Sequence, residues 1–61
     1  MKKTLVKSDA TMSEVKDYLE KNNYRTDDVT VGEFALYAEG CQDADFFELE
    51  ENDGLYNLYV C

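Results

Sequence analysis

The fold is decided by residues 45–61, which read DFFELEENDGLYNLYVC. Near the middle of this stretch, the Asp53-Gly54 pair predicts a two-residue hairpin turn of type I′, because both central positions of that turn need a positive φ. A two-residue turn also fixes the pairing of the flanking strands, so that Leu49 faces Leu58. The sequence therefore predicts an antiparallel hairpin with a defined register.

Side chains of this hairpin alternate between two faces. The apolar face suits packing against a helix and carries Phe47, Leu49, Tyr56, Leu58 and Val60. The other face carries Phe46, Glu48, Glu50, Asn57 and Tyr59. Residues 31–39 show the same period of two, which predicts a further strand that adds Glu33, Tyr37 and Glu39 to the second face.

A helix is expected before these strands. Thr11 and Glu14 have the spacing of a capping box, in which each side chain accepts a hydrogen bond from a backbone N–H at the helix start, and Ser8 and Asp9 are alternative caps. Apolar residues then recur at intervals of three and four over residues 12–22. The two asparagines that follow favour a left-handed residue that ends the helix.

These elements predict an α+β fold of the order β-α-β-β-β, with one helix packed on one face of a mostly antiparallel sheet. The first strand is the short apolar run of residues 4–7. Because 61 residues without a repeat or linker make one small core, we expect a single domain over residues 1–61. The pattern does not place the first strand within the sheet.

Charge is distributed unevenly along the chain. The formal net charge is −8, from 14 Asp and Glu residues against six Lys and Arg residues. All the basic residues lie in residues 1–25, whereas residues 26–61 hold ten of the carboxylates. Such an asymmetry favours a cationic partner and opposes direct contact with nucleic acid or with an anionic membrane.

Composition disfavours catalysis, metal binding and membrane insertion. Histidine is absent, so the commonest general base is missing, and we expect neither an enzyme nor a cofactor. Cys41 and Cys61 are too few for a zinc site or a disulfide framework and are expected to be free thiols. Asp43 and Asp45 fall in a loop that lacks the pattern of a calcium-binding loop. No apolar run suits a signal peptide or a membrane span, so we expect a cytoplasmic protein.

The acidic sheet face is the predicted binding surface. A plain alternative is that its carboxylates only keep a small sheet soluble. Binding is favoured for two reasons. Residues 26–61 contain no lysine that would relieve the repulsion between carboxylates on neighbouring strands. Aromatic side chains, which are enriched in binding surfaces, lie among these carboxylates. The predicted partner-binding residues are Glu33, Tyr37, Glu39, Asp43, Asp45, Phe46, Glu48, Glu50 and Tyr59.

In size and charge, the whole chain resembles the small inhibitors encoded by bacteriophages and mobile elements, such as anti-CRISPR proteins, anti-restriction proteins and inhibitors of host RNA polymerase or uracil-DNA glycosylase. The resemblance implies a basic, nucleic-acid-binding partner in a host cytoplasm. The leading hypothesis is an inhibitor that occupies the basic surface of a CRISPR effector, restriction enzyme or polymerase, by nucleic-acid mimicry or by charge alone. The alternative is a protein interaction module, an antitoxin, assembly subunit or homodimer, that uses an aromatic face or a sheet edge.

Overall fold

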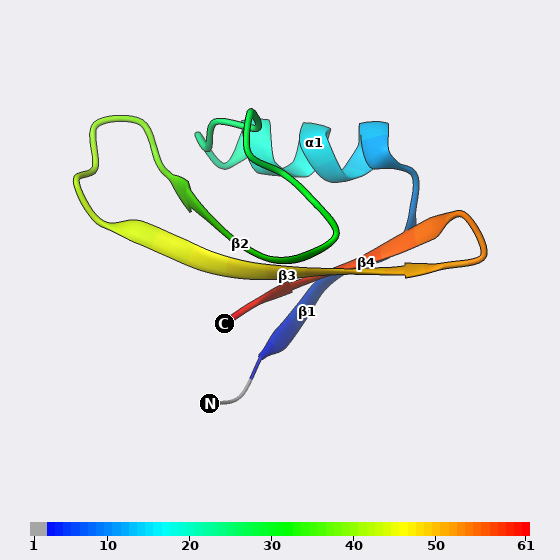
Figure 1. Cartoon of the computed structure of the whole chain (residues 1–61). Coiled ribbons are helices and arrows are strands. Elements are labelled where there is room, and N and C mark those ends of the chain that lie inside the picture. The colour runs from blue at the N-terminus through cyan, green and yellow to red at the C-terminus, as the bar shows by residue number, and fades with distance from the viewer. Residues whose placement is uncertain (1–2) are drawn as a thin grey trace.

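The computed structural model describes residues 3–61, which form one helix and four strands (Figure 1). In chain order these are β1 (Thr4–Ala10), α1 (Met12–Lys21), β2 (Gly32–Tyr37), β3 (Ala44–Asn52) and β4 (Leu55–Val60). The strands make a single sheet of order β1-β4-β3-β2, in which every neighbouring pair is antiparallel. The predicted α+β class and element order are confirmed.

The β3–β4 hairpin has the register that the Asp-Gly turn predicts. Leu49 faces Leu58, and Asn52 faces Leu55 across the turn. Asp53 has a φ of 54° and Gly54 a φ of 82°, so both central residues take the positive values that a type I′ turn needs.

The capping box at the start of α1 is also formed. The Thr11 side-chain oxygen accepts from the Glu14 N–H at 3.2 Å, and the Glu14 carboxylate accepts from the Thr11 N–H at 2.9 Å. The hydrogen bond from the Thr11 backbone is the main cause that lowers the pKa of Glu14. At the other end, Asn22 caps the helix and Asn23 takes a left-handed φ of 67°.

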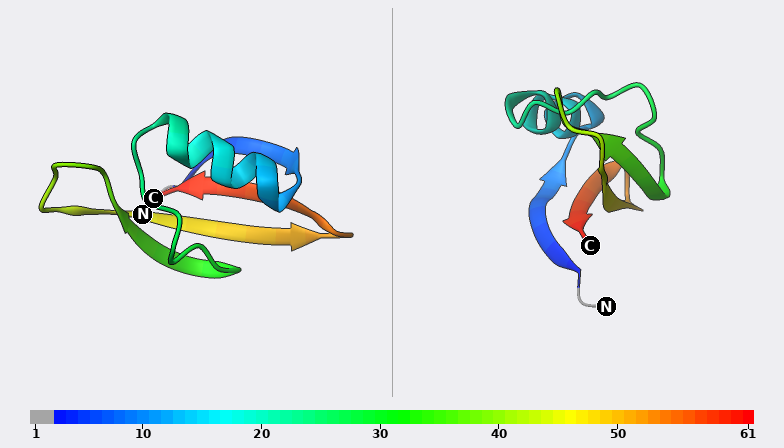
Figure 2. Two further views of the ribbon diagram at one scale, coloured as in Figure 1. Left: turned by 90° about the horizontal axis from the view of Figure 1, so that it is seen from above. Right: turned by 90° about the vertical axis from the view of Figure 1, so that its left-hand side faces the viewer.

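The core lies on one side of the sheet, which α1 covers in part and the connection between α1 and β2 covers further. Figure 2 shows α1 on one side of the sheet, and its contacts are with β1 and β4. In the connection between α1 and β2, the Tyr24 ring packs edge-on against Phe47 of β3, and Val29 also packs against the core. Fully buried side chains such as Leu19 and Leu58 each contribute about 1.5–3 kcal/mol of apolar transfer free energy. The buried members are Ala10, Val15, Leu19, Phe34, Leu36, Phe47, Leu49 and Leu58.

Strand β1 is longer than the predicted residues 4–7 and lies at the edge of the sheet beside β4. Two register shifts interrupt the β1–β4 pairing, one between Leu5 and Lys7 and one between Lys7 and Ala10. Asp9 belongs to this strand rather than to the helix cap, and its N–H donates to Asn57 Oδ1 at 3.1 Å. This position of β1 brings the N-terminal segment to the C-terminal hairpin.

Candidate protein-binding face

The side of the sheet opposite α1, which we call the open face, collects most of the predicted binding residues. No segment of residues 3–61 lies over this side in the views of Figures 1 and 2. Cross-strand pairing aligns Glu33 of β2, Glu48 of β3, Tyr59 of β4 and Leu5 of β1 in one row. The open face consists of Leu5, Glu33, Ala35, Tyr37, Phe46, Glu48, Glu50, Asn57 and Tyr59.

Glu48 at the centre of this row is held by a lysine from the start of the chain. Lys3 Nζ lies 2.7 Å from Glu48 Oε2 and 4.5 Å from the centroid of the Tyr59 ring. The hydrogen bond to Glu48 is the main cause that raises the pKa of Lys3. The open face therefore carries a cation from the N-terminal segment, although residues 26–61 contain no basic residue.

Glu50 is held by neighbours on β4. Its Oε1 accepts from Asn57 Nδ2 at 3.1 Å and from the Tyr59 hydroxyl at 3.3 Å. Desolvation and the charge of Glu50 together raise the pKa of Tyr59, so this hydroxyl keeps its proton. These contacts orient the Glu50 carboxylate on the surface.

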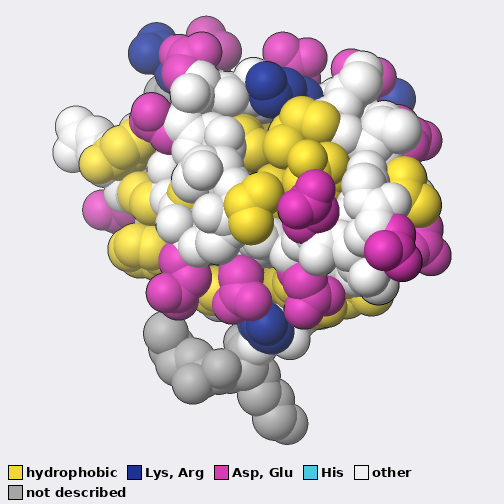
Figure 3. Space-filling model, turned by 45° about the vertical axis from the view of Figure 1, so that its right-hand side comes forward, with side chains coloured by type: hydrophobic (Ala, Val, Ile, Leu, Met, Phe, Trp, Pro, Cys, Tyr) yellow, Lys and Arg dark blue, Asp and Glu magenta, His cyan; other side chains and the backbone are white. Residues whose placement is uncertain are grey.

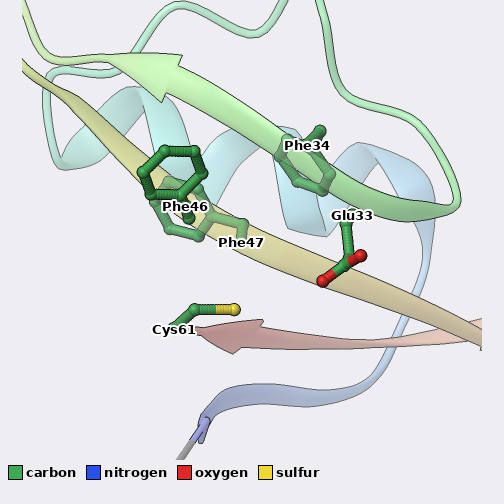
Figure 4. A pocket seen from close by; sticks show the side chains of 5 residues that line it. All are labelled: Glu33, Phe34, Phe46, Phe47 and Cys61. Atoms are coloured by element: carbon green, nitrogen blue, oxygen red, sulfur yellow. The ribbon is translucent and has the colours of Figure 1, made fainter. Parts of the chain in front are cut away.

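Glu33 differs from the other two carboxylates, because no side chain of residues 3–61 donates a hydrogen bond or forms an ion pair with it. It lies beside a hollow of about 280 Å³ whose other lining residues are Phe34, Phe46, Phe47 and Cys61. Figure 4 shows Phe46 and Glu33 at opposite sides of this hollow, with the Cys61 sulfur directed between them. The hollow is thus apolar, with one carboxylate at its rim.

Large apolar side chains are exposed among these charges. Phe46 has an exposed fraction of 62%, Tyr37 of 55% and Leu5 of 49%. In the view of Figure 3, acidic side chains line the lower border of the molecule and a basic side chain lies among them. The open face therefore combines charged side chains with exposed aromatic rings, a residue type that is enriched in protein interfaces.

Three predicted binding residues lie outside the open face. Asp45 faces Leu36 in the β2–β3 pairing, which places it on the covered side of the sheet, where its carboxylate accepts a hydrogen bond from the Tyr24 hydroxyl. This bond, followed by burial, raises the pKa of Tyr24 to about 12. Asp43 and Glu39 are exposed in the loop that joins β2 to β3.

Three open-face residues, Leu5, Ala35 and Asn57, are not among the predicted binding residues, although the hairpin register already places Asn57 on this face. Leu5 joins the face because β1 pairs with β4, for which the sequence pattern held no signal. Ala35 faces Phe46, and period-two alternation places it there, but a methyl group carries no chemistry to single it out. Lys2, one of the basic residues within residues 1–25, lies outside the described residues.

Other candidate chemistry is scarce in the part of the chain that the structure describes. Cys41 and Cys61 are free and exposed. Residues 3–61 bring together no group of three or more Cys, Asp or Glu side chains that could hold a metal ion. No helix within residues 3–61 is long and apolar enough to cross a lipid bilayer.

Comparison of the chain with models of known protein families, with curated proteins and with solved structures gives no match.

Proposed function

We propose that this protein binds a basic, nucleic-acid-binding protein through its open face and inhibits that partner by occupying the surface that would hold nucleic acid. The observation that carries the proposal is the open face itself, where Glu33, Glu48 and Glu50 share one side of the sheet with the exposed ring of Phe46. A cytoplasmic setting is part of the same proposal.

The charge of the chain supports a cationic partner. A formal net charge of −8 on 61 residues attracts basic surfaces over distances of about a Debye length and repels nucleic acid. Lys/Arg-lined grooves that hold nucleic acid are strongly basic surfaces of this kind. An acidic protein that docks in such a groove competes with the nucleic acid for the same cations.

The exposed aromatic side chains support a protein partner rather than a solvated acidic surface. Phe46 and Tyr37 are more than half exposed, and aromatic residues supply much of the binding energy in protein interfaces. The carboxylates of the open face set the charge that the partner must complement, while the Phe46 ring supplies apolar contact area.

The test begins with capture of the partner from the native cell or its host, followed by affinity measurements with the isolated pair. The variant Glu48→Gln/Glu50→Gln removes two charges from the open face but keeps oxygen acceptors for Lys3, Asn57 and Tyr59. We expect it to weaken the complex by roughly tenfold or more at low salt.

The matched control is Asp17→Asn/Glu20→Gln, which removes the same net charge from exposed positions of α1. Because α1 lies on the other side of the sheet, this variant should bind almost as tightly as the wild type. Equal loss of affinity in both variants would show that net charge, and not the open face, attracts the partner.

The second candidate, an apolar interaction module or homodimer, is favoured by the exposure of Leu5, Tyr37 and Phe46. It predicts that Phe46→Ala dominates the loss of affinity and that raising the salt concentration barely weakens the complex. A salt titration separates the two candidates, since an electrostatic complex weakens steeply. Sedimentation of the isolated protein decides whether the partner is a second copy.

A further inference from the structure

We propose that the hollow beside Phe46 receives an arginine side chain of the partner, with its guanidinium between the Glu33 carboxylate and the exposed ring of Phe46. The inference rests on the proposed function for the existence of a cationic partner. It adds the chemical group that the open face recognises and the place where that group binds.

The size and lining of the hollow suit one long side chain. Its volume of about 280 Å³ lies below the usual range of sites for drug-sized ligands. Phe46 gives it an exposed apolar wall, and its other lining residues are Glu33, Cys61 and the largely buried Phe34 and Phe47, which belong to the core. A side chain that is apolar along its stem and cationic at its tip satisfies both parts of this lining.

The state of the three open-face carboxylates points to Glu33 as the anchor. Lys3 already occupies Glu48, and the Glu50 oxygen accepts from Asn57 and Tyr59. Glu33 has no such contact within residues 3–61, so an incoming cation reaches it without displacing a bound group. The free energy of a charge-assisted hydrogen bond to Glu33 is therefore not reduced by the loss of an existing contact.

The exposed ring of Phe46 favours arginine over lysine. A planar guanidinium stacks on an aromatic face and can form two parallel hydrogen bonds with a carboxylate, whereas an ammonium acts as a point charge. Phe46 has the largest exposed fraction, 62%, of the large apolar residues exposed in residues 3–61, and it stands across the hollow from Glu33 (Figure 4). One guanidinium between the two side chains can use both interactions.

The test is an NMR titration of the full chain with three probes: acetyl-arginine amide, acetyl-lysine amide and acetyl-citrulline amide, the last being a neutral isostere of arginine. We expect saturable shifts of the Glu33, Phe46 and Cys61 amides with the arginine probe, at a Kd of roughly 1 mM. Citrulline should bind at least about fivefold more weakly, because it lacks the charge that pairs with Glu33. Lysine should bind about threefold more weakly, because it stacks less well on Phe46.

Variants locate the binding. Glu33→Gln and Phe46→Ala should each lower the affinity for the arginine probe by about threefold or more, while Glu20→Gln, which removes a charge from the exposed side of α1, should leave it unchanged. Glu33 and Phe46 are exposed, so neither substitution should unfold the protein. The dispersion of the amide signals in the NMR spectrum checks that each variant remains folded.

Equal binding of citrulline and arginine, equal loss in Glu20→Gln, or the absence of saturable shifts would each overturn the proposed arginine site. None of these results would contradict the proposed function, which is tested by the identity of the partner and by the salt dependence of the complex. Conversely, a captured partner that binds no nucleic acid would contradict the proposed function and leave the probe titration unaffected.

Discussion

Lys3 Nζ lies 2.7 Å from Glu48 Oε2, so a residue 45 positions away in the chain supplies a counter-ion at the centre of the acidic face. Glu48 is also the direct cross-strand neighbour of Glu33, and like charges in such positions destabilise a sheet. Lys3 relieves part of this repulsion in the free protein. A partner that brings its own cation to Glu48 has to displace Lys3.

Replacement of Lys3 should therefore tighten binding of a basic partner. We expect Lys3→Gln to raise the affinity by roughly two- to fivefold at low salt, because Glu48 is then available without competition. The control is Lys16→Gln, which makes the same change of net charge on the exposed side of α1. Isothermal titration of the partner with both variants measures the difference, and weaker binding of Lys3→Gln than of Lys16→Gln would mean that Lys3 itself contacts the partner.

Titration of Tyr24 should make the stability of the fold depend on pH in the alkaline range. The hydrogen bond to Asp45 raises the pKa of Tyr24 from its ordinary value of 10.0 to about 12. A raised pKa means that this stabilisation is complete below pH 10 and is lost as the pH rises through 12. Denaturant unfolding at a series of pH values should show the free energy of unfolding fall across this window.

The variant Tyr24→Phe should lose about 1 kcal/mol at pH 7 and show a smaller fall between pH 10 and 12. Tyr18→Phe serves as the control, since no hydrogen bond from the Tyr18 hydroxyl is found in residues 3–61. If Tyr24→Phe kept the full alkaline dependence of the wild type, another group would be responsible for it.

The hairpin turn should tolerate asparagine at its first central position but no side chain at its second. Gly54 has a φ of 82°, where a Cβ atom is strained, so Gly54→Ala should cost about 1–2 kcal/mol. Asp53→Asn should stay within about 0.5 kcal/mol, because asparagine readily adopts the left-handed conformation of Asp53. Thermal unfolding compares the two, and equal effects would argue against the strained-turn explanation.

Local signals in the sequence account for most of the fold. The Asp53-Gly54 turn fixes the β3–β4 register, and the Thr11 capping box fixes the start of α1, because each depends on residues that are close in the chain. The same period-two reasoning placed Glu33, Glu48 and Glu50 on one face. These parts of the structure could be predicted because a few neighbouring residues determine them.

Contacts between distant segments could not be predicted in this way. The run of residues 4–7 is apolar and β-branched, but nothing in it selects β4 as its neighbouring strand. The sequence therefore does not predict the contact between Lys3 and Glu48. Asp45 is among the predicted binding residues, although the alternation of side chains along β3 places it on the opposite face from Phe46. Its contact with Tyr24 depends on how the connection after α1 folds back over β3, and no local pattern records that.

The central claim is that the open face competes with nucleic acid for a basic protein surface. The most direct measurement is displacement of a labelled nucleic acid from the captured partner by increasing concentrations of this protein, followed by fluorescence anisotropy. We predict full displacement by the wild type and by Asp17→Asn/Glu20→Gln, and displacement by Glu48→Gln/Glu50→Gln only at roughly tenfold higher concentration. A complex in which the partner keeps its nucleic acid while this protein is bound would contradict the claim.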